Sequence, residues 1–217
     1  MPKIVDPMAR RRAVAQAVLS VAARQGLEHA SLRNVADEAG LAVGSVRHYF
    51  ADHDELMVFT MRELSRRIGE RVRAHAERLL TPDDRTDCTD RTDRTDRTDR
   101  RVGTEDLLAE FLPLDEARRQ ESALWLAFTA AALTRPELRP CADEMQANLH
   151  ALLSRVLHEA RSTGGLPGGL DVELESTRLA ALLDGLNLQA TLLPDRFPAE
   201  LLRQVLRRHL DALGVGG

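Results

Sequence analysis

A short polar cluster near the N-terminus holds the side chains best suited to chemistry with another molecule. Residues 43–50, VGSVRHYF, place a hydroxyl, a guanidinium, an imidazole and a phenol within five consecutive positions. Val46 and Phe50 lie four positions apart, so one face of a helix can bury both of them. The polar side chains then point elsewhere and can hydrogen-bond to a partner: Ser45, Arg47, His48 and Tyr49.

Residues 31–42 supply the elements that would present this cluster. Ser31 can cap a first helix, whose apolar residues recur at helical spacing: Leu32, Val35, Ala36 and Ala39. Gly40 follows at the position where a left-handed residue ends a helix. The small side chains around the turn let two short helices cross closely, as in a helix-turn-helix. A helix pair this short buries little, so we expect its second helix to be presented to a partner.

This segment resembles the DNA-binding head of the TetR family of bacterial repressors. The matching features are a capping hydroxyl with a Val-Ala step, an Ala-Gly-hydrophobe turn, and a glycine before an aromatic-ending helix: Ser31, Val35-Ala36, Ala39-Gly40-Leu41, Gly44 and Tyr49-Phe50, with the spacing continuing to Leu56. The likeness covers roughly the first quarter of the chain, and beyond it only the helical layout agrees. The resemblance implies an all-α protein with an N-terminal helix-turn-helix DNA-binding domain and a C-terminal helical domain for ligand binding and dimerisation.

The resemblance also assigns roles to individual side chains. In such heads the second helix enters the major groove of double-stranded DNA, and different residues contact base edges and phosphates. We expect contacts to base edges from Val43, Gly44, Ser45 and His48. We expect contacts to the phosphate backbone from Ser31, Arg33, Arg47 and Tyr49. The run Arg10-Arg11-Arg12 is either a further phosphate contact or a solvated charge run.

Three positions depart from the usual pattern of the family. Ala42 stands where a Ser or Thr often caps the recognition helix, and Arg47 stands where a phosphate-binding Tyr is common. Asp54 stands near the start of the following helix, where a Lys often contacts the DNA backbone. The carboxylate of Asp54 would repel phosphate unless the neighbouring His53 offsets its negative charge. These changes affect individual DNA contacts rather than the expected fold.

Composition supports a helical protein with a locally basic head. The 217 residues are 43% hydrophobic and only 3% aromatic, and the net charge is −4. Ala, Leu, Arg and Glu dominate, which favours helices. The first 50 residues hold seven Lys or Arg against four Asp or Glu, a net charge of +3, so the remainder carries −7. A basic head on an acidic body suits local phosphate binding.

The sequence indicates an intracellular protein without a membrane anchor. Cys88 and Cys141 form no disulfide or metal-binding pattern, and residues 1–12 hold no apolar signal-peptide core. The longest apolar run, residues 123–133, is well short of the roughly 20 residues that a membrane helix needs. We therefore expect a cytoplasmic location and no membrane partner.

The chain divides into an expected DNA-binding domain, residues 1–53, and a regulatory and dimerisation domain, residues 54–217. A long helix over about residues 54–80 should leave the head. Residues 82–104 are expected to be a low-complexity linker, because their Asp-Arg-Thr repeat offers almost no apolar side chain to bury. The alternative, an Arg-rich arm that grips DNA, is weakened because Asp cancels nearly every Arg.

The last two expected helices, over residues 172–193 and from Pro198 onward, are the predicted dimer-forming pair. The apolar positions of the first of these helices cover more than one face, which a single core is not expected to bury alone. Two apolar-rich helices per chain resemble the four-helix bundle of TetR dimers, and the spacing of residues 182–186 is similar to that of BetI-type members. The expected interface residues are Leu182, Leu186, Leu202, Val205, Leu206 and Leu210.

Helices over about residues 116–133 and 145–160 are expected to border an effector pocket inside the body. The expected ligand-binding residues are Trp125, Phe128, Met145, Leu149 and Asn187, although any single apolar one can equally be plain core. A mostly apolar lining with one polar amide favours a hydrophobic or amphipathic small molecule. We expect no metal and no cofactor. A quaternary amine is less favoured, because aromatic cages need several rings.

The function indicated is a ligand-responsive transcriptional regulator, in the simplest case a repressor that binds a palindromic operator as a homodimer. An enzyme is not expected, because the seven histidines are scattered and no paired carboxylates, nucleophile elbow or Cys/His metal spacing can be assembled. The stronger alternative is a helical small-molecule carrier or adaptor without DNA binding, because Ala42 and Asp54 weaken the head. Retention of the protein on DNA at low salt would separate the two.

Overall fold

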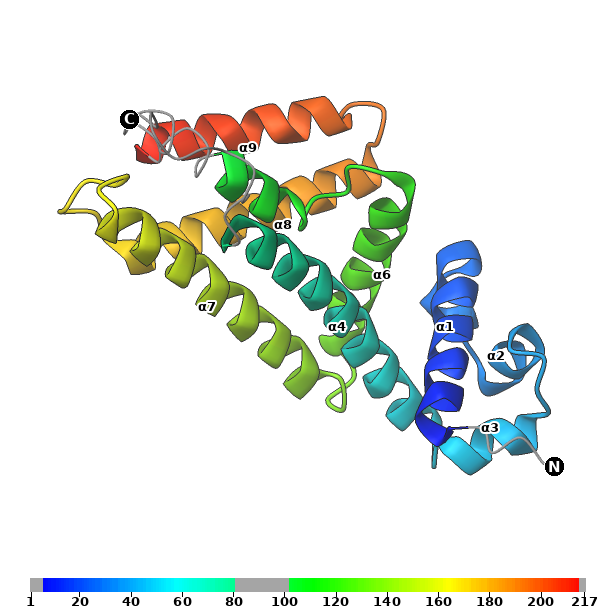
Figure 1. The fold of residues 1–217 in the computed structure, drawn as a ribbon. Coiled ribbons are helices and arrows are strands. Elements are labelled where there is room, and N and C mark those ends of the chain that lie inside the picture. The colour runs from blue at the N-terminus through cyan, green and yellow to red at the C-terminus, as the bar shows by residue number, and fades with distance from the viewer. Residues whose placement is uncertain (1–5, 81–101, 215–217) are drawn as a thin grey trace, which may run out of the picture. The chain divides into compact units, whose positions relative to one another are not determined.

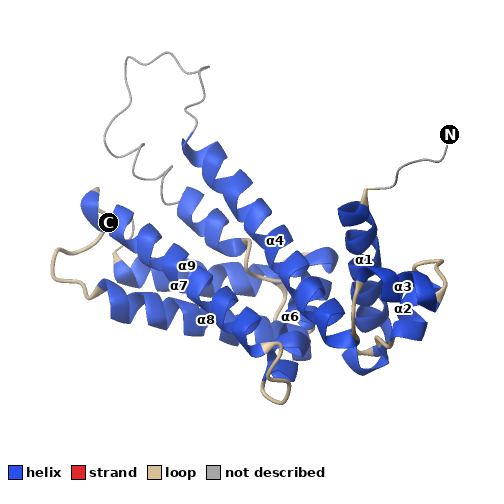
Figure 2. Ribbon diagram, turned by 90° about the horizontal axis from the view of Figure 1, so that it is seen from below, coloured by secondary structure: helices blue, strands red, loops and turns tan. Residues whose placement is uncertain are grey.

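The computed structural model describes residues 6–80 and 102–214, and every regular element within those two ranges is a helix (Figure 1, Figure 2). The all-α class predicted from the sequence is therefore confirmed. Cys88 and most of the predicted linker, residues 82–101, lie outside the described residues.

The N-terminal elements are α1 (Pro7–Gln25), the single 3-10 turn η1 (Leu27–His29), α2 (Leu32–Glu38) and α3 (Val43–Tyr49). The carboxylate of Asp6 caps α1 by accepting the amide hydrogen of Met8 at 2.9 Å. Gly26 after α1 has φ 96° and Gly40 after α2 has φ 64°, a backbone region that side chains disfavour. The helix end predicted at Gly40 is confirmed, and Asp6 and Gly26 mark the two ends of α1.

The remaining helices are α4 (His53–Leu80), a short helix over residues 102–109, α6 (Glu116–Ala132), α7 (Arg139–Ser162), α8 (Val172–Leu192) and α9 (Ala199–Leu213). The short helix begins at residue 102, so residues 102–104 at the end of the predicted linker are helical. Its position depends on distant residues, since the Glu105 carboxylate accepts two hydrogen bonds from Arg207 of α9, each 2.9 Å long. Local propensity alone does not reveal such a contact.

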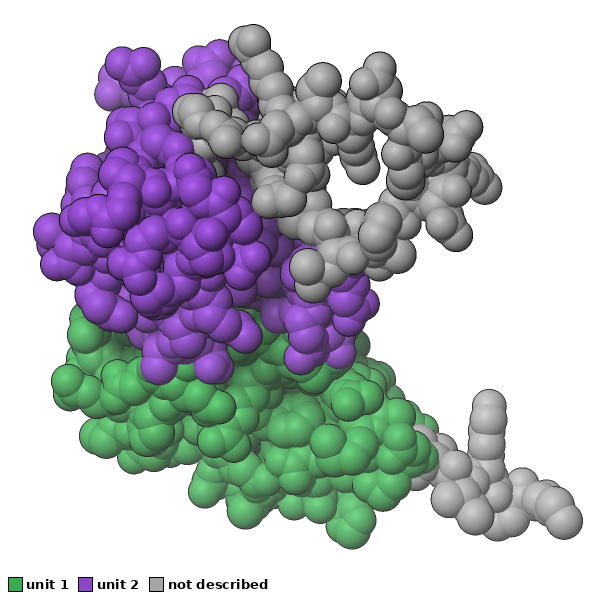
Figure 3. Space-filling view, turned by 60° about the vertical axis from the view of Figure 1, so that its left-hand side comes forward, with its two compact units in different colours: residues 1–67, 120–145 green, residues 68–119, 146–217 purple. Residues whose placement is uncertain are grey.

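The chain folds into two compact units (Figure 3). The helices α4, α6 and α7 each contribute residues to both units. Unit 1 comprises Met1–Arg67 and Gln120–Met145, and unit 2 comprises Ile68–Arg119 and Gln146–Gly217. The division by function, into residues 1–53 and 54–217, remains a prediction.

Each unit buries its own apolar side chains. In the head, four valines of α1, α2 and α3 and the phenylalanine that follows α3 are at most 1% exposed: Val14, Val18, Val35, Val46 and Phe50. In unit 2, leucines of the short helix, α7, α8 and α9 form one continuous core, including Leu108, Leu153, Leu179 and Leu206. Packing in the head therefore decides which face of α3 is buried and which is left for a partner.

Candidate nucleic-acid interface

The outward face of α3 follows from the burial of one residue. Val46 is fully buried, and 3.6 residues per turn set successive side chains about 100° apart around the helix. Gly44 and His48 therefore lie nearly opposite Val46, and Ser45 and Arg47 flank them on either side. All four are exposed. The structure thus brings four of the predicted DNA-binding residues onto one solvent-facing surface, where the absent side chain of Gly44 permits close approach.

The residues at the two ends of α3 are less accessible. Val43 and Tyr49 are half-buried, because each lies about 60° from Val46 around the helix. The Tyr49 ring packs edge-on against the His48 ring, with centroids 5.3 Å apart and an interplanar angle of 70°. This aromatic contact supports one side of the imidazole and favours a fixed orientation for it.

Ser31 caps α2, as predicted. Its hydroxyl oxygen accepts the amide hydrogen of Asn34 at 3.2 Å, and the side chain remains exposed. A hydroxyl can accept and donate at the same time, so a phosphate contact by Ser31 would use its remaining hydrogen. Ala42 precedes α3 and forms no side-chain cap, which agrees with the loss of the usual Ser or Thr.

Half of the arginines in residues 6–50 form ion pairs with carboxylates of the same chain. The ion pairs are Arg11–Glu55 at 2.7 Å, Arg12–Glu63 at 3.8 Å and Arg24–Glu38 at 2.5 Å. Within the described residues, no carboxylate pairs with Arg10, Arg33 or Arg47, and the last two are exposed. The charges of Arg33 and Arg47 are therefore available to a partner molecule, whereas Arg11 and Arg12 pair with carboxylates of α4.

The start of α4 offers an acidic side chain where the family often has a basic one. Asp54 is 48% exposed and lies 3.9 Å from the Nδ1 atom of His53. The other ring nitrogen of His53 donates to the carbonyl oxygen of Ala30 at 2.9 Å. One ring nitrogen of His53 is thus used by the backbone of the head, while the other stays close to the carboxylate of Asp54.

The predicted ligand-binding residues are divided between the two units. Trp125, Phe128 and Met145 belong to unit 1, whereas Leu149 and Asn187 belong to unit 2. Phe128 is fully buried, Met145 and Leu149 are at most 8% exposed, and Trp125 is half-buried. The apolar members therefore contribute to the cores of their own units, as the alternative interpretation allowed.

Asn187 has a structural role that the sequence did not show. Its side-chain amide donates to the carbonyl oxygen of Phe111 at 2.7 Å and to that of Leu183 at 3.1 Å. The first of these bonds joins α8 to the turn that follows the short helix. Both amide hydrogens are therefore used within unit 2, and a polar residue at this position is explained without a ligand.

The predicted dimer-interface residues differ in how far their own chain buries them. Leu202 and Leu206 are fully buried within unit 2 of a single chain, Leu210 is 1% exposed and Leu186 is 6% exposed. Side chains buried in their own chain offer little surface to a second copy. Contact of these four residues with a partner stays a prediction, and a stripe of leucines has the same spacing whether it packs internally or against a partner. Leu182 and Val205 are only partly buried and remain candidates.

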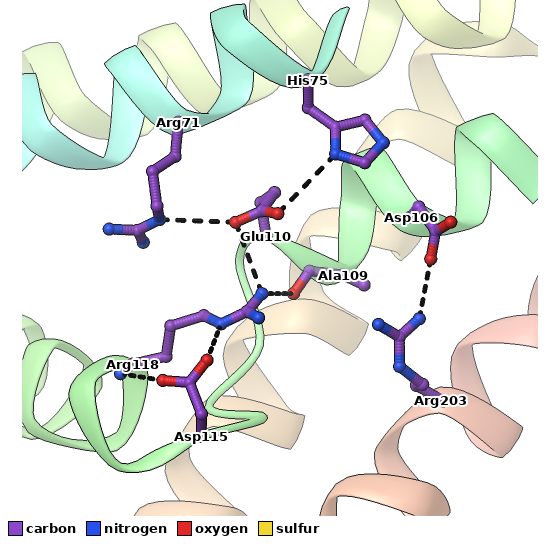
Figure 4. Close-up of polar contacts among 8 residues, drawn as sticks. All are labelled: Arg71, His75, Asp106, Ala109, Glu110, Asp115, Arg118 and Arg203. Carbon is purple, nitrogen blue, oxygen red and sulfur yellow. Dashed lines mark hydrogen bonds and ion pairs between the residues drawn. The ribbon is translucent and has the colours of Figure 1, made fainter. Parts of the chain in front are cut away.

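Glu110 joins three segments of unit 2 (Figure 4). Its carboxylate accepts from Nε of Arg71 and from Nη1 of Arg118, each at 3.3 Å, and lies 3.7 Å from Nδ1 of His75. Arg71 and His75 are on α4, and Arg118 is in the first turns of α6. Because its side chain is only 16% exposed, Glu110 is a poorly hydrated charge that depends on these partners.

Neighbouring ion pairs extend this connection (Figure 4). Asp115 accepts from the backbone amide of Arg118 at 2.9 Å and from its Nε atom at 2.7 Å. These two hydrogen bonds, the backbone one first, lower the pKa of Asp115. Asp106 of the short helix accepts from Arg203 of α9 at 2.9 Å. Charged contacts therefore connect the segment from 106 to 118 with both α4 and α9.

Among the described residues, no helix combines the length and apolar character required to cross a membrane. In the same part of the chain, no three His, Cys, Asp or Glu side chains come together in a way that could hold a metal ion.

A head with an outward-facing polar recognition helix, followed by a helical body, defines a helix-turn-helix DNA-binding protein. Residues 16–60 match the family described as bacterial regulatory proteins, tetR family. Residues 101–215 match the family described as BetI-type transcriptional repressor, C-terminal. The chain therefore belongs to the TetR family of bacterial transcriptional regulators.

Individual relatives agree with this assignment over nearly their full length. The chain is 30% identical to the transcriptional regulator PksA of Bacillus subtilis, covering 99% of this chain and 95% of the relative. It is also 30% identical to a solved transcriptional regulator from Rhodococcus, with a TM-score of 0.71 over 94% and 95% of the two chains. The multidrug binding protein EbrR, solved with imidazole, is 30% identical, with a TM-score of 0.59 over 92% and 94%. These findings set aside a carrier or adaptor without DNA binding.

Proposed function

We propose that this regulator is a cytoplasmic repressor that binds a palindromic operator as a homodimer and leaves it when a hydrophobic or amphipathic small molecule binds. The observation that carries the DNA-binding part is the outward face of α3, where Ser45, Arg47 and His48 are exposed around Gly44. Side chains of these types can read base edges and neutralise phosphate. Two such heads would contact half-sites about 34–36 Å apart, one turn of DNA.

The dimer is supported by the exposed face of α8. Leu174, Leu188 and Leu192 are 56%, 42% and 65% exposed, unusually high for leucine. They recur with Ala181 and Gly185 at intervals that place all five on one side of the helix. The two small residues would allow the helix of a second copy to approach closely, with leucines packing at either end. This face replaces the buried leucines as the proposed centre of the interface.

The effector class is supported by the chemistry of the body. Phe128, Met145 and Leu149 are apolar, and Trp125 adds a large ring with one polar N–H group. Sites that bind hydrophobic ligands combine such linings with a few polar groups. With only 3% aromatic residues in the chain, an aromatic cage for a quaternary amine is difficult to build.

A route for the effector signal is supported by Glu110. The Arg71 and His75 side chains that it contacts are on α4, the helix that directly follows the DNA-binding head. An effector that shifts the segment from 110 to 118 would change these contacts and favour another position of α4. Because the charges are largely removed from water, exchanging their partners has a substantial free-energy cost, as a two-state switch requires.

Selection of genomic DNA fragments by the purified protein tests the operator. The expected result is enrichment of fragments that contain two inverted half-sites about one helical turn apart, together with a dimeric mass by light scattering. Enrichment of a single half-site, or a monomer bound to DNA, would contradict the homodimer.

The fluorescence of Trp125, the only tryptophan, tests the effector part. A small molecule that releases the selected DNA should change this emission over the same concentration range. Trp125→Leu should shift the concentration needed for release. An effector that releases DNA without changing the emission, and that acts equally on Trp125→Leu, would place the effector site elsewhere.

A further inference from the structure

Arg11 of α1 contacts the residues that link α3 to α4. Its guanidinium carbon lies 4.5 Å from the centroid of the Phe50 ring and 4.6 Å from that of the Phe59 ring. The two rings meet edge to face with centroids 5.5 Å apart. The Nη2 atom of Arg11 donates to Glu55 Oε1 at 2.7 Å. One cation of α1 thus contacts two aromatic rings and a carboxylate around the start of α4.

Glu55 of α4 also bonds to the residues between α3 and α4. Its Oε2 atom accepts the backbone amide of Ala51 at 2.7 Å, and its own amide donates to Asp52 Oδ1 at 2.7 Å. The amide of Ala51 first, and the guanidinium of Arg11 second, lower the pKa of Glu55. Phe50 ends α3 and is 1% exposed. Arg11 and Glu55 together therefore fix the residue at which the recognition helix stops.

The guanidinium of Arg11 is poorly accessible to a DNA phosphate. Its side chain is 26% exposed, whereas that of Arg24, on the same helix, is 55% exposed. Its Nε atom is buried and has no hydrogen-bond partner within the described residues. A cation over aromatic rings with a carboxylate at 2.7 Å is already neutralised and largely removed from water. A phosphate would have to displace these contacts.

We propose that Arg11 is a positioning residue for DNA binding: it sets the orientation of α3 against α1 and α4 without contacting DNA. This inference rests on α3 being the helix that contacts DNA. Without the contacts that Arg11 makes, α3 would sample other orientations, and only a fraction of the molecules would hold α3 in the orientation that binds DNA. Apparent affinity falls in proportion to that fraction. The bound complex keeps the same phosphate contacts, so the dependence of affinity on salt stays the same.

The test compares Arg11→Met with Arg10→Met, two neighbouring substitutions that remove the same charge. Operator affinity is measured at several salt concentrations, at a temperature where circular dichroism shows both variants fully folded. A second readout is the backbone amide signal of Tyr49 in protein labelled with ¹⁵N-tyrosine. Tyr49 is the only tyrosine and the last residue of α3, so this label gives a single signal from the end of the recognition helix.

Arg11→Met is expected to weaken operator affinity about tenfold, as when one molecule in ten remains competent. The salt dependence should be unchanged, and the Tyr49 signal of the free protein should shift or broaden. Arg10→Met should leave the Tyr49 signal in place. If Arg11→Met does not fold, Glu55→Gln replaces it, with the same changes expected in smaller degree.

Two results would overturn the proposal. A decrease in the salt dependence of about one phosphate contact per head would make Arg11 a DNA contact. If folded Arg11→Met shows unchanged operator affinity and an unchanged Tyr49 signal, Arg11 contributes only to stability. Failure of the wild-type protein to bind any selected operator would instead count against the proposed function.

Discussion

Arg47→Ala should lower the salt dependence of operator binding by a predictable amount. Arg47 is exposed on α3 and has no carboxylate partner among the described residues, so its whole charge is available to a phosphate. Each phosphate contact contributes about 0.9 to the slope of log K against log salt concentration. A dimer loses one contact per head, so the slope should fall by about 1.8.

This change has a direct consequence for affinity. Between 50 and 200 mM salt, a fourfold range, a slope difference of about 1.8 corresponds to roughly a twelvefold difference in affinity. The wild-type protein should therefore lose about twelve times more affinity than the variant over this range. The loss should be similar for all operator sequences, because phosphates carry no base identity. Fluorescence anisotropy with a labelled operator measures both quantities.

Arg24→Ala is the matched control. Arg24 is also an exposed arginine of the head, but its two terminal nitrogens donate to the two carboxylate oxygens of Glu38, and this lowers the pKa of Glu38. Its removal should leave the slope unchanged. An Arg47→Ala slope equal to that of the wild type would refute the phosphate contact. A slope reduced by only about 0.9 would mean that one head binds per complex. A loss confined to one base pair would mean that Arg47 reads sequence.

Further predictions concern the body. Leu188→Glu should give monomers by light scattering, because Leu188 is 42% exposed on the proposed interface, and a dimer that persists would move the interface off this face of α8. Leu206→Ala should instead lower the free energy of unfolding by about 2–5 kcal/mol in urea denaturation, because Leu206 is fully buried, and a smaller loss with dissociation would return it to the interface. Glu110→Gln should raise the effector concentration needed for DNA release while leaving operator affinity nearly unchanged, since it weakens the contact to α4; an unaltered release curve would exclude this route. Burial, and secondly Arg178, lower the pKa of His209, so the unfolded state binds more protons below about pH 6.5. Stability should therefore be constant above about pH 7.5 and fall by at most about 1.4 kcal/mol per pH unit as the pH drops below 6.5, and His209→Gln should remove this component of the decrease.

Local features of the sequence predicted the head well. Asp6, Ser31 and Gly40 act within three or four residues of their own position, so their types alone indicate where helices begin and end. The outward face of α3 could also be predicted, because burying Val46 leaves only one side of a short helix exposed.

Features that depend on distant partners could not be predicted in this way. The run of arginines gives no sign that Arg11 lies against Phe59 or that Arg12 pairs with Glu63, since both partners come from α4. The leucines of α9 show an apolar stripe, but periodicity does not state whether their own chain or another covers it. The hydrogen bond from Asn187 to the backbone of Phe111 could not be predicted either, because the two residues lie 76 positions apart.

The internal pairing of head arginines has a consequence for how the regulator finds its operator in a genome. With three arginines of residues 6–50 neutralised by Glu38, Glu55 and Glu63, the attraction of the head to random DNA is weaker than its composition suggests. A chromosome offers on the order of a million or more competing sites, and each bound copy is withdrawn from the search. Weak nonspecific binding keeps more copies free. A small number of molecules per cell can then occupy the operator. Because few molecules have to be released from it, relief of repression needs correspondingly little effector.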